Sequence, residues 1–465
     1  MSEGTEFANG AAADSGPGSR RGARFVQGLL DADTRPVPEA LRALGDAEPS
    51  TDGVPRARYT SRAFHAAEVE MLWPRVWQMA CREEQVPEVG DSLVYDIART
   101  SLVVVRVAPD EIRAFRNSCL HRGTALRSEP GRIGALRCPF HGFTWNLDGT
   151  FAGMPCPWDF PHVDSTTFCL PEAQVGRWGG FVFVRLDDEG EALEDYLEIL
   201  PAHFSAWPLE ERVLVAHVVR VVPCNWKVAL EAFIESYHTV AVHPQLLTTS
   251  GDAQTQYDVY SGVRHVNRMI TPVGVASDHV DHPVGEQDIV DAMFMTNDGH
   301  RAVVGEGSTA RAVLAERVRA QLAERTGRDY AALSDTEALD AVEYFVFPNF
   351  VPWAGYTTPL VYRFRPNGDD HRSSIMDVML LDPLPATGAR PVAAPTRHLG
   401  DGERWADAPE LGYLGRILDQ DSATLGRVQR GLEAAPGPGL TLARDQESRI
   451  RHFHDTLGVY VPSSP

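Results

Sequence analysis

Two short pairs of cysteine and histidine residues constrain this 465-residue chain more than any other feature of its sequence. The first pair is Cys119-Leu-His121, the second is Cys138-Pro-Phe-His141, and 16 residues lie between them. Thiolates and imidazoles in two tight pairs can hold a zinc ion or an iron–sulfur cluster. The fold must therefore bring two loops together at one point.

The residues around these pairs predict that both loops leave β-strands. Residues 115–117 precede the first pair and residues 135–137 precede the second, and Asp148-Gly149 predicts a tight hairpin turn shortly afterwards. Further β-rich runs occupy residues 93–97, 102–107 and 180–186. We therefore expect a small all-β domain around the two loops.

This segment resembles a Rieske domain, including Arg122-Gly123 after the first histidine and Gly142-Phe-Thr-Trp145 after the second. The resemblance implies a 2Fe–2S cluster in which two thiolates hold one iron and two imidazoles hold the other. Its implied ligands are Cys119, His121, Cys138 and His141.

The same loops separate two kinds of Rieske domain. Respiratory-chain Rieske proteins carry one more cysteine in each loop, and the two cysteines form a disulfide. Thr124 and Phe140 occupy those positions here, so the disulfide is absent. The resemblance is therefore to the Rieske domains of ferredoxins and oxygenases.

A second group of metal-binding residue types lies within residues 225–244. On a continuous helix Glu231, Glu235 and His238 share one face, and Pro244 disfavours helix at His243. We expect a helix over residues 226–238 and then a turn that brings His243 back to His238. Two imidazoles and one carboxylate can hold iron(II) in a facial triad, although a core helix with incidental histidines fits this spacing as well.

After a Rieske pair, this pattern resembles the Rieske non-heme iron oxygenases, which have an acid, two residues, a histidine, four residues and a second histidine. That pattern, often preceded by Asn-Trp-Lys, matches Glu235, His238 and His243. The resemblance also implies a third ligand from a late helix, where Asp421 precedes Gln429 at the family's spacing. Asp419 remains the competing carboxylate.

Glu235 lies one helical turn before His238, so its carboxylate can accept a hydrogen bond from that histidine. The resemblance implies more: this acid also reaches a Rieske histidine, His141 of a neighbouring copy, in a ring-shaped homotrimer or α3β3 assembly. On that ground we class Glu235 as a catalytic residue.

The resemblance covers about residues 60–460 and predicts an α+β chain. We expect a flexible tail over residues 1–55, a Rieske domain with a leading helix over 56–195, and a mononuclear-iron catalytic domain over 196–465. The catalytic domain should hold an antiparallel sheet flanked by helices. Its expected strands are residues 213–222, 344–347, 360–364 and 374–381, and its expected helices include 309–325 and 412–432.

Composition excludes several other classes of protein. The net charge of −21 argues against a general nucleic-acid binder, because phosphate binding depends on basic surface. Six cysteines are too few for a disulfide scaffold. The sequence has no apolar stretch of about 18 residues and no signal-peptide pattern, so we expect a cytoplasmic protein without a membrane span.

The resemblance implies a terminal oxygenase with one Rieske cluster, one mononuclear Fe(II) and O2 as co-substrate. Electrons from NAD(P)H should arrive through a separate reductase, with or without a ferredoxin. Apolar residues within 250–300 favour a largely apolar substrate, and the resemblance implies that it contains a ring and is hydroxylated by mono- or dioxygenation. Three alternatives remain: a pure electron carrier, a zinc-dependent hydrolase or binding module, and an oxidative N- or O-demethylase.

Overall fold

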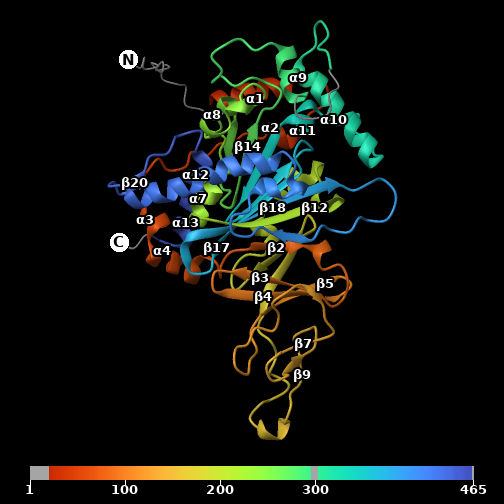
Figure 1. Ribbon diagram of the computed structural model, residues 1–465, viewed down its shortest axis with the longest axis vertical. Helices are drawn as coiled ribbons and strands as arrows, with labels where there is room; N and C mark the ends of the chain where they lie inside the picture. Colours follow the sequence, from red (N-terminus) through yellow and green to blue (C-terminus); the bar gives the residue numbers. More distant parts are fainter. Residues whose placement is uncertain (1–19, 295–301, 463–465) are drawn as a thin grey trace.

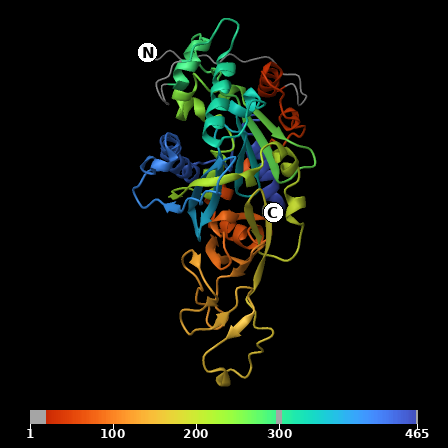
Figure 2. The same cartoon turned by 90° about the vertical axis from the view of Figure 1, so that its right-hand side faces the viewer.

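The computed structural model of the chain describes residues 20–294 and 302–462. Residues 1–19 of the predicted tail, and the last residues of the predicted pocket stretch, lie outside the described part. Figure 1 shows the β-rich unit below a larger unit built on a long sheet, and Figure 2 shows the same elongated arrangement from the side. This agrees with the predicted α+β class.

The β-rich unit is a seven-stranded antiparallel sheet in the order β2-β11-β10-β5-β4-β3-β6. Alternate residues of a strand point to opposite faces of its sheet. Leu102 and Val104 of β4 accordingly join the main core, whereas Val103 and Val105 join a smaller core beneath the predicted cluster loops. The strands are β2 Gln78–Arg82, β3 Asp91–Ile97, β4 Thr100–Ala108, β5 Glu111–Arg116, β6 Gly131–Arg132, β10 Glu172–Trp178 and β11 Phe181–Arg185.

A three-stranded sheet made of β7 Leu136–Arg137, β8 Thr144–Trp145 and β9 Phe151–Gly153 extends from this unit. The predicted hairpin between β8 and β9 is confirmed: the Asn146 amide donates to the Thr150 carbonyl at 2.8 Å. Gly149 adopts φ 82°, a conformation that a side chain disfavours. The turn thus requires the glycine that the sequence supplies.

The larger unit is built on an eight-stranded sheet in the order β13-β14-β15-β16-β17-β18-β12-β19. Its pairs are antiparallel, as predicted, except for the edge strand β19, which lies parallel to β12. The strands are β12 Arg212–Val222, β13 Gln256–Val259, β14 Val266–Thr271, β15 Ala341–Val346, β16 Phe350–Ala354, β17 Leu360–Asn367, β18 Asp370–Pro383 and β19 Thr396–His398.

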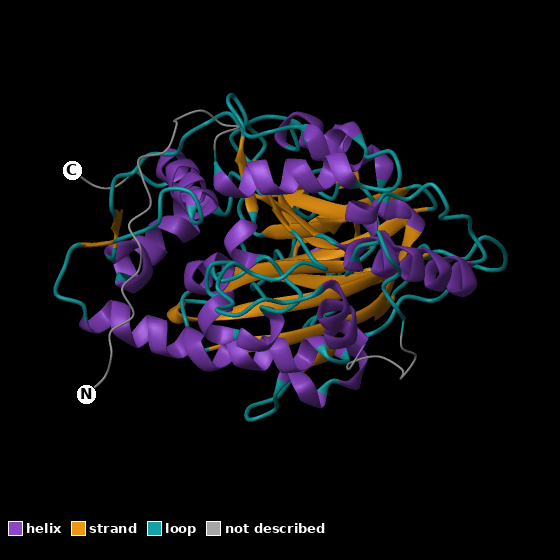
Figure 3. Ribbon diagram, turned by 90° about the horizontal axis from the view of Figure 1, so that it is seen from above, coloured by secondary structure: helices purple, strands orange, loops and turns teal. Residues whose placement is uncertain are grey.

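Helices surround this sheet when it is seen from above (Figure 3). Helix α7 packs on β17 and β18, and the long helix α12 packs on α7. Helix α12 carries the predicted ligand Asp421, and α7 leads into the turn that carries Glu235 and His238. The helices beyond the β-rich unit are α5 Leu193–Tyr196, α6 Leu200–His203, α7 Trp226–Glu231, α8 Thr239–Val242, α9 Glu286–Phe294, α10 Ala310–Thr326, α11 Asp335–Leu339, α12 Leu414–Ala434 and α13 Ser448–Tyr460.

The structure differs from the predicted flexible tail at residues 20–55. Helices α1 Arg21–Ala32 and α2 Glu39–Arg42 form here, and Val26, Leu30 and Leu41 are buried. Val26 and Leu30 are four residues apart and share one helix face, an apolar stripe that the Gly- and Asp-rich composition conceals. Strand β1 Val54–Pro55 then pairs with β20 Gly439–Leu440.

The sequence predicts the leading helix over about residues 61–77 with Ser61 as its cap, and the Ser61 hydroxyl does accept a hydrogen bond from the Phe64 amide at 3.2 Å. Helices α3 Ala57–Thr60 and α4 Arg62–Ala67 are followed by a π-helical turn over Glu68–Leu72, so the helix is shorter than predicted. Among the described helices, none combines the length and apolar character that crossing a bilayer requires.

Candidate metal centres

The two predicted cluster loops have the same backbone design. In each loop the cysteine amide donates to a carbonyl five residues ahead, Thr124 or Phe143, at 2.8 Å. In each loop a glycine with φ 77° donates back to the cysteine carbonyl. These turns direct the side chains of the two loops towards each other, as a bound cluster requires. Asn117 clamps the first loop by accepting hydrogen bonds from the amides of residues 126 and 127.

The side chains of the four predicted ligands fit a binuclear cluster. Cys119 and Cys138 are both buried and interact through their thiols, and the rings of His121 and His141 lie 4.7 Å apart. The Nδ1 atoms of both histidines are buried without a hydrogen-bond partner. Both atoms are therefore free to bind a metal.

The spacing of these donors does not fit a single zinc ion. Four ligands around one tetrahedral zinc would place their donor atoms about 3.3–3.8 Å from one another, given bonds of roughly 2.0–2.3 Å. Within residues 20–294 and 302–462, only His238, His243 and Asp421 bring three donor atoms within 4.8 Å of one another. The thiols are paired and the imidazoles are paired, but the four do not surround one point.

The predicted long helix around the second site is wrong beyond Glu231, where α7 ends. Backbone groups of the next residues bind tertiary partners instead of continuing the helix. Arg449 donates to the Ile234 carbonyl at 3.1 Å, and the Ser236 amide donates to the Tyr257 hydroxyl at 3.1 Å. Glu231 therefore does not share a helix face with Glu235 and His238.

The turn after α7 is closed by the carboxylate of Glu235. Its Oε2 accepts the His238 amide at 3.0 Å, and its Oε1 lies 2.7 Å from His238 Nδ1. Burial lowers the pKa of His238, but Glu235 and Asp421 outweigh burial, and the net effect is a raised pKa. The carboxylate thus fixes both the backbone and the ring of His238.

The predicted ligands of the mononuclear site converge. Helix α8 ends before His243, whose Nε2 lies 2.7 Å from Asp421 Oδ1, and His238 Nε2 lies 3.6 Å from the same oxygen. Asp421 lies on the buried face of α12. His238 and His243 each turn Nδ1 to a neighbouring side chain and Nε2 towards Asp421. Two imidazoles and one carboxylate in this arrangement suit iron(II).

The competing carboxylate, Asp419, has a different environment. Its two oxygens accept the backbone amides of Trp405 and Ala406 at 2.9 and 3.2 Å. They begin a short turn beside α12, away from the two histidines. Asp421 is the carboxylate that faces them.

Sequence reasoning missed two features beside this site. Gln420 Oε1 lies 3.0 Å from His243 Nδ1, and only the neighbouring aspartate could have drawn attention to it. Glu231 accepts a hydrogen bond from Tyr59 and lies 2.8 Å from His454 Nε2, and burial raises the pKa of Glu231 to about 8. Both partners of Glu231 lie more than 150 residues away in the sequence, so no local sequence pattern predicts these contacts.

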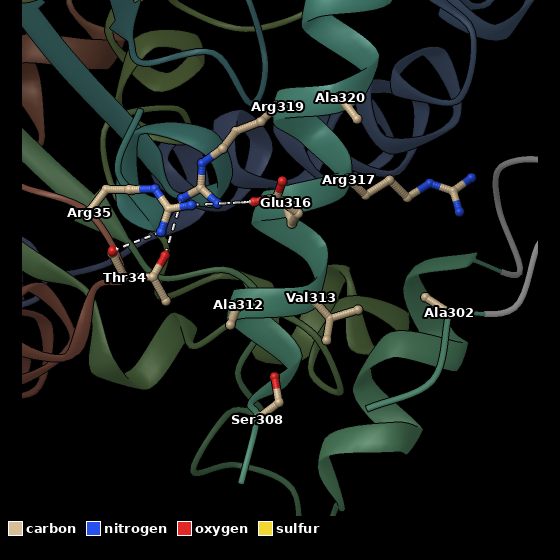
Figure 4. Close-up of a pocket in the computed structure, with 10 residues that line it drawn as sticks. All are labelled: Thr34, Arg35, Ala302, Ser308, Ala312, Val313, Glu316, Arg317, Arg319 and Ala320. Atoms are coloured by element: carbon tan, nitrogen blue, oxygen red, sulfur yellow. Dashed lines mark hydrogen bonds and ion pairs between the residues drawn. The ribbon is translucent and has the colours of Figure 1, made fainter. Parts of the chain in front are cut away.

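A surface hollow lies apart from both centres, between α10 and the segment that follows α1 (Figure 4). Arg319 Nη2 donates to the Thr34 hydroxyl at 3.5 Å, Arg35 Nε donates to the Ala331 carbonyl at 3.0 Å, and the Thr34 amide donates to Asp335 at 2.9 Å. These bonds hold the N-terminal segment on the catalytic unit. None of the predicted metal ligands lines the hollow.

Comparison with known families matches both units of the chain. The family described as ring hydroxylating alpha subunit (catalytic domain) matches residues 202–463, and the Rieske 2Fe–2S domain matches residues 76–164. The glycine betaine monooxygenase oxygenase subunit of Pseudomonas aeruginosa is 30% identical over 220 residues, 46% of this chain and 51% of that protein. The anthranilate 1,2-dioxygenase large subunit of Acinetobacter baylyi is 27% identical over 293 residues, 61% and 57% of the two chains.

The chain thus spans about half the length of the curated relatives it matches. Solved structures are similar over more of the fold. A quaternary ammonium Rieske monooxygenase matches with a TM-score of 0.63 and 18% identity, over 88% of this chain and 95% of that one. A naphthalene 1,2-dioxygenase matches with a TM-score of 0.61 and 15% identity, over 90% and 94%.

The family matches agree with the donor geometry at both centres. A Rieske 2Fe–2S cluster and a mononuclear iron site are typical of this family, and each has a fitting set of side chains here. The matched catalytic region alone covers more than half of the chain. The chain belongs to the Rieske non-heme iron oxygenases, as an alpha subunit with a Rieske domain and a ring-hydroxylating catalytic domain.

Proposed function

We propose that the protein is the terminal oxygenase of a multicomponent system and hydroxylates a small organic substrate with O2 and electrons from NAD(P)H. Its cluster ligands are Cys119, His121, Cys138 and His141, and its iron ligands are His238, His243 and Asp421. The convergence of these last three side chains, in a chain that also carries the Rieske loops, is the observation that carries the proposal. A pure electron carrier needs only the Rieske cluster and no second set of metal ligands.

The side chains prepare the second centre for its metal. Iron held there would supply O2 activation, and the Rieske cluster would supply electrons one at a time. Glu235 holds His238 through its Nδ1, so that Nε2 faces Asp421. Asp421 is almost fully buried, which keeps water from competing for its carboxylate.

Glu235 is also the proposed link between subunits. In a homotrimer or α3β3 assembly its carboxylate would accept a hydrogen bond from His141 of a neighbour while still holding His238. Two observations support this: the Glu235–His238 pair reaches the surface, with 9% and 25% of the two side chains exposed, and His141 lies between β7 and β8 of the small sheet that extends from the β-rich unit. A reductase, with or without a ferredoxin, would deliver electrons to the cluster.

Aromatic side chains near the second centre support the substrate proposal. Phe233 and Tyr362 lie 4.9 Å apart, and Trp353 adds a third ring 6.4 Å from Tyr362. Burial and the nearby Asp421 carboxylate both raise the pKa of Tyr362. Such a group suits an apolar ring, our first candidate. It also suits a quaternary ammonium group through cation–π attraction, a second candidate that several relatives' names favour.

Oxygen consumption tests the proposal directly. The purified protein is combined with a Rieske-oxygenase reductase, NADH and one compound at a time, and products are identified by mass spectrometry. The panel holds aromatic acids, neutral aromatics, quaternary ammonium compounds, and N- or O-methyl compounds. Coupled oxygen uptake with a hydroxylated or demethylated product is expected in one class. A protein that accepts electrons but consumes no oxygen with any class, while retaining its mononuclear iron, would favour the electron carrier.

A further inference from the structure

His238 and His243 are oriented by different chemistry. His238 Nδ1 meets the carboxylate of Glu235 at 2.7 Å, whereas His243 Nδ1 meets the amide oxygen of Gln420 at 3.0 Å. Gln420 directly precedes Asp421 on α12, and His243 Nε2 lies 2.7 Å from that aspartate. One helix therefore supplies both a ligand and the group that turns the neighbouring ligand towards it.

A second glutamine fixes which end of the Gln420 amide faces His243. Gln245 Nε2 donates to Gln420 Oε1 at 2.8 Å, and Gln420 Nε2 points back to Gln245 Oε1 at 3.5 Å. With its oxygen accepting from Gln245, the Gln420 amide also presents that oxygen to His243 Nδ1. An oxygen can only accept there, so Nδ1 must carry a proton, and Nε2 is the nitrogen left for a metal that would replace its 2.7 Å contact with Asp421.

We propose that Gln420 and Gln245 are positioning residues that hold His243 in the tautomer whose bare Nε2 faces the metal. This inference rests on the proposed ligand set. A neutral imidazole binds a metal through the nitrogen that has no proton, and the hydrogen bond at the other nitrogen selects it. His238 is thus oriented by a charged hydrogen-bond acceptor and His243 by a neutral one.

Cobalt binding by the full-length protein, with the mononuclear metal removed by chelation and the cluster retained, tests the proposal without turnover. Equilibrium dialysis gives the dissociation constant of Co(II). Gln420→Leu keeps the side-chain volume but removes the acceptor, and we expect Co(II) binding roughly 10- to 100-fold weaker. Gln420→Glu restores an acceptor and should bind Co(II) at least as tightly as the unmodified chain.

Gln245→Glu is the sharper variant, because Gln245 touches no proposed ligand. A carboxylate at this position can only accept, which favours turning the Gln420 amide so that its NH2 faces both neighbours. His243 Nδ1 must then accept, Nε2 carries the proton, and Co(II) binding weakens as in Gln420→Leu. Gln245 is exposed, so this variant should fold even if Gln420→Leu does not.

Ser422→Ala is the matched control. It removes a hydrogen bond of similar length on the same helix, from Trp405 Nε1 at 2.9 Å, without touching His243. Its Co(II) affinity should be unchanged. The proposal would be overturned if Gln420→Leu or Gln245→Glu bound Co(II) as tightly as the unmodified chain. It would also be overturned if Gln420→Glu bound Co(II) as weakly as Gln420→Leu. Absence of a Co(II) site in the unmodified chain would instead count against the proposed ligand set.

Discussion

Replacing Lys227, the only lysine of the chain, with methionine should lower the urea concentration at which the protein unfolds. Lys227 Nζ lies 2.7 Å from Glu68 Oε1, and both side chains are 0% exposed. Trp226 Nε1 also donates to Glu68, at 3.4 Å. The pair joins the π-helical turn Glu68–Leu72 to α7, which leads directly into the turn that carries Glu235 and His238.

The size of the effect follows from burial. At 2.7 Å the attraction is about 6 kcal/mol for an effective dielectric constant of about 20, and much of it offsets the cost of removing both charges from water. Removing one partner leaves the other charge buried and unpaired, which costs about 3–5 kcal/mol. Lys227→Met should therefore lose that amount, whereas Lys227→Met with Glu68→Leu should recover most of it.

The loss should also depend on pH. Burial raises the pKa of Glu68, and Lys227 opposes that rise. Without Lys227 the folded-state pKa of Glu68 rises further above its unfolded value, so the folded state binds the proton more tightly. Stability is then retained below the unfolded pKa and lost as the pH rises through the folded pKa. The single variant should be closer to the unmodified protein at pH 5 than at pH 8.

Urea unfolding followed by tryptophan fluorescence at both pH values measures these differences. A single variant destabilised by less than about 1 kcal/mol at pH 8 would contradict this prediction, since the expected loss comes only from the unpaired buried charge of Glu68. A double variant no more stable than the single one would refute it as well.

The remaining predictions concern individual side chains. His121→Ala should abolish or alter the Rieske EPR signal, and an unchanged spectrum would reject that ligand. Glu235→Gln keeps an acceptor for His238 Nδ1, so it should retain both metals and a reducible cluster; single-turnover kinetics should show strongly slowed electron arrival, and undiminished coupled turnover would argue against the bridge. Glu231 has a folded-state pKa of about 8, so it contributes stability that is complete below its unfolded pKa near 4.5 and is lost as the pH rises to 8. Glu231→Gln should therefore flatten the pH dependence of the free energy of unfolding across this window. Equal slopes in both proteins would contradict this prediction.

Local patterns predicted the parts of this fold that local chemistry determines. Strand β12 begins one residue before its predicted run, and helix α10 is displaced from its predicted bounds by only one residue at each end. Asp148-Gly149 predicted the hairpin because that turn needs a positive φ at one position. These elements depend on periodicity and turn chemistry within a few residues.

Tertiary contacts decided the parts that were predicted wrongly. The helix expected through His238 ends at Glu231, because Arg449 and Tyr257 take the backbone groups that would have continued it. Helix α1 forms in a segment with a tail-like composition, because the catalytic unit covers Val26 and Leu30. The family resemblance supplied Asp421, whereas Gln420 became visible only when α12 was seen against His243.

Counting iron and acid-labile sulfide per chain tests most directly whether this single chain holds two different metal centres. We expect about three irons and two sulfides in the reconstituted protein, falling to about two irons and two sulfides in His238→Ala. Asp421→Ala should lose the same single iron, and Asp419→Ala should keep all three. Three irons in His238→Ala, or a loss of the third iron in Asp419→Ala but not in Asp421→Ala, would contradict the proposed second centre.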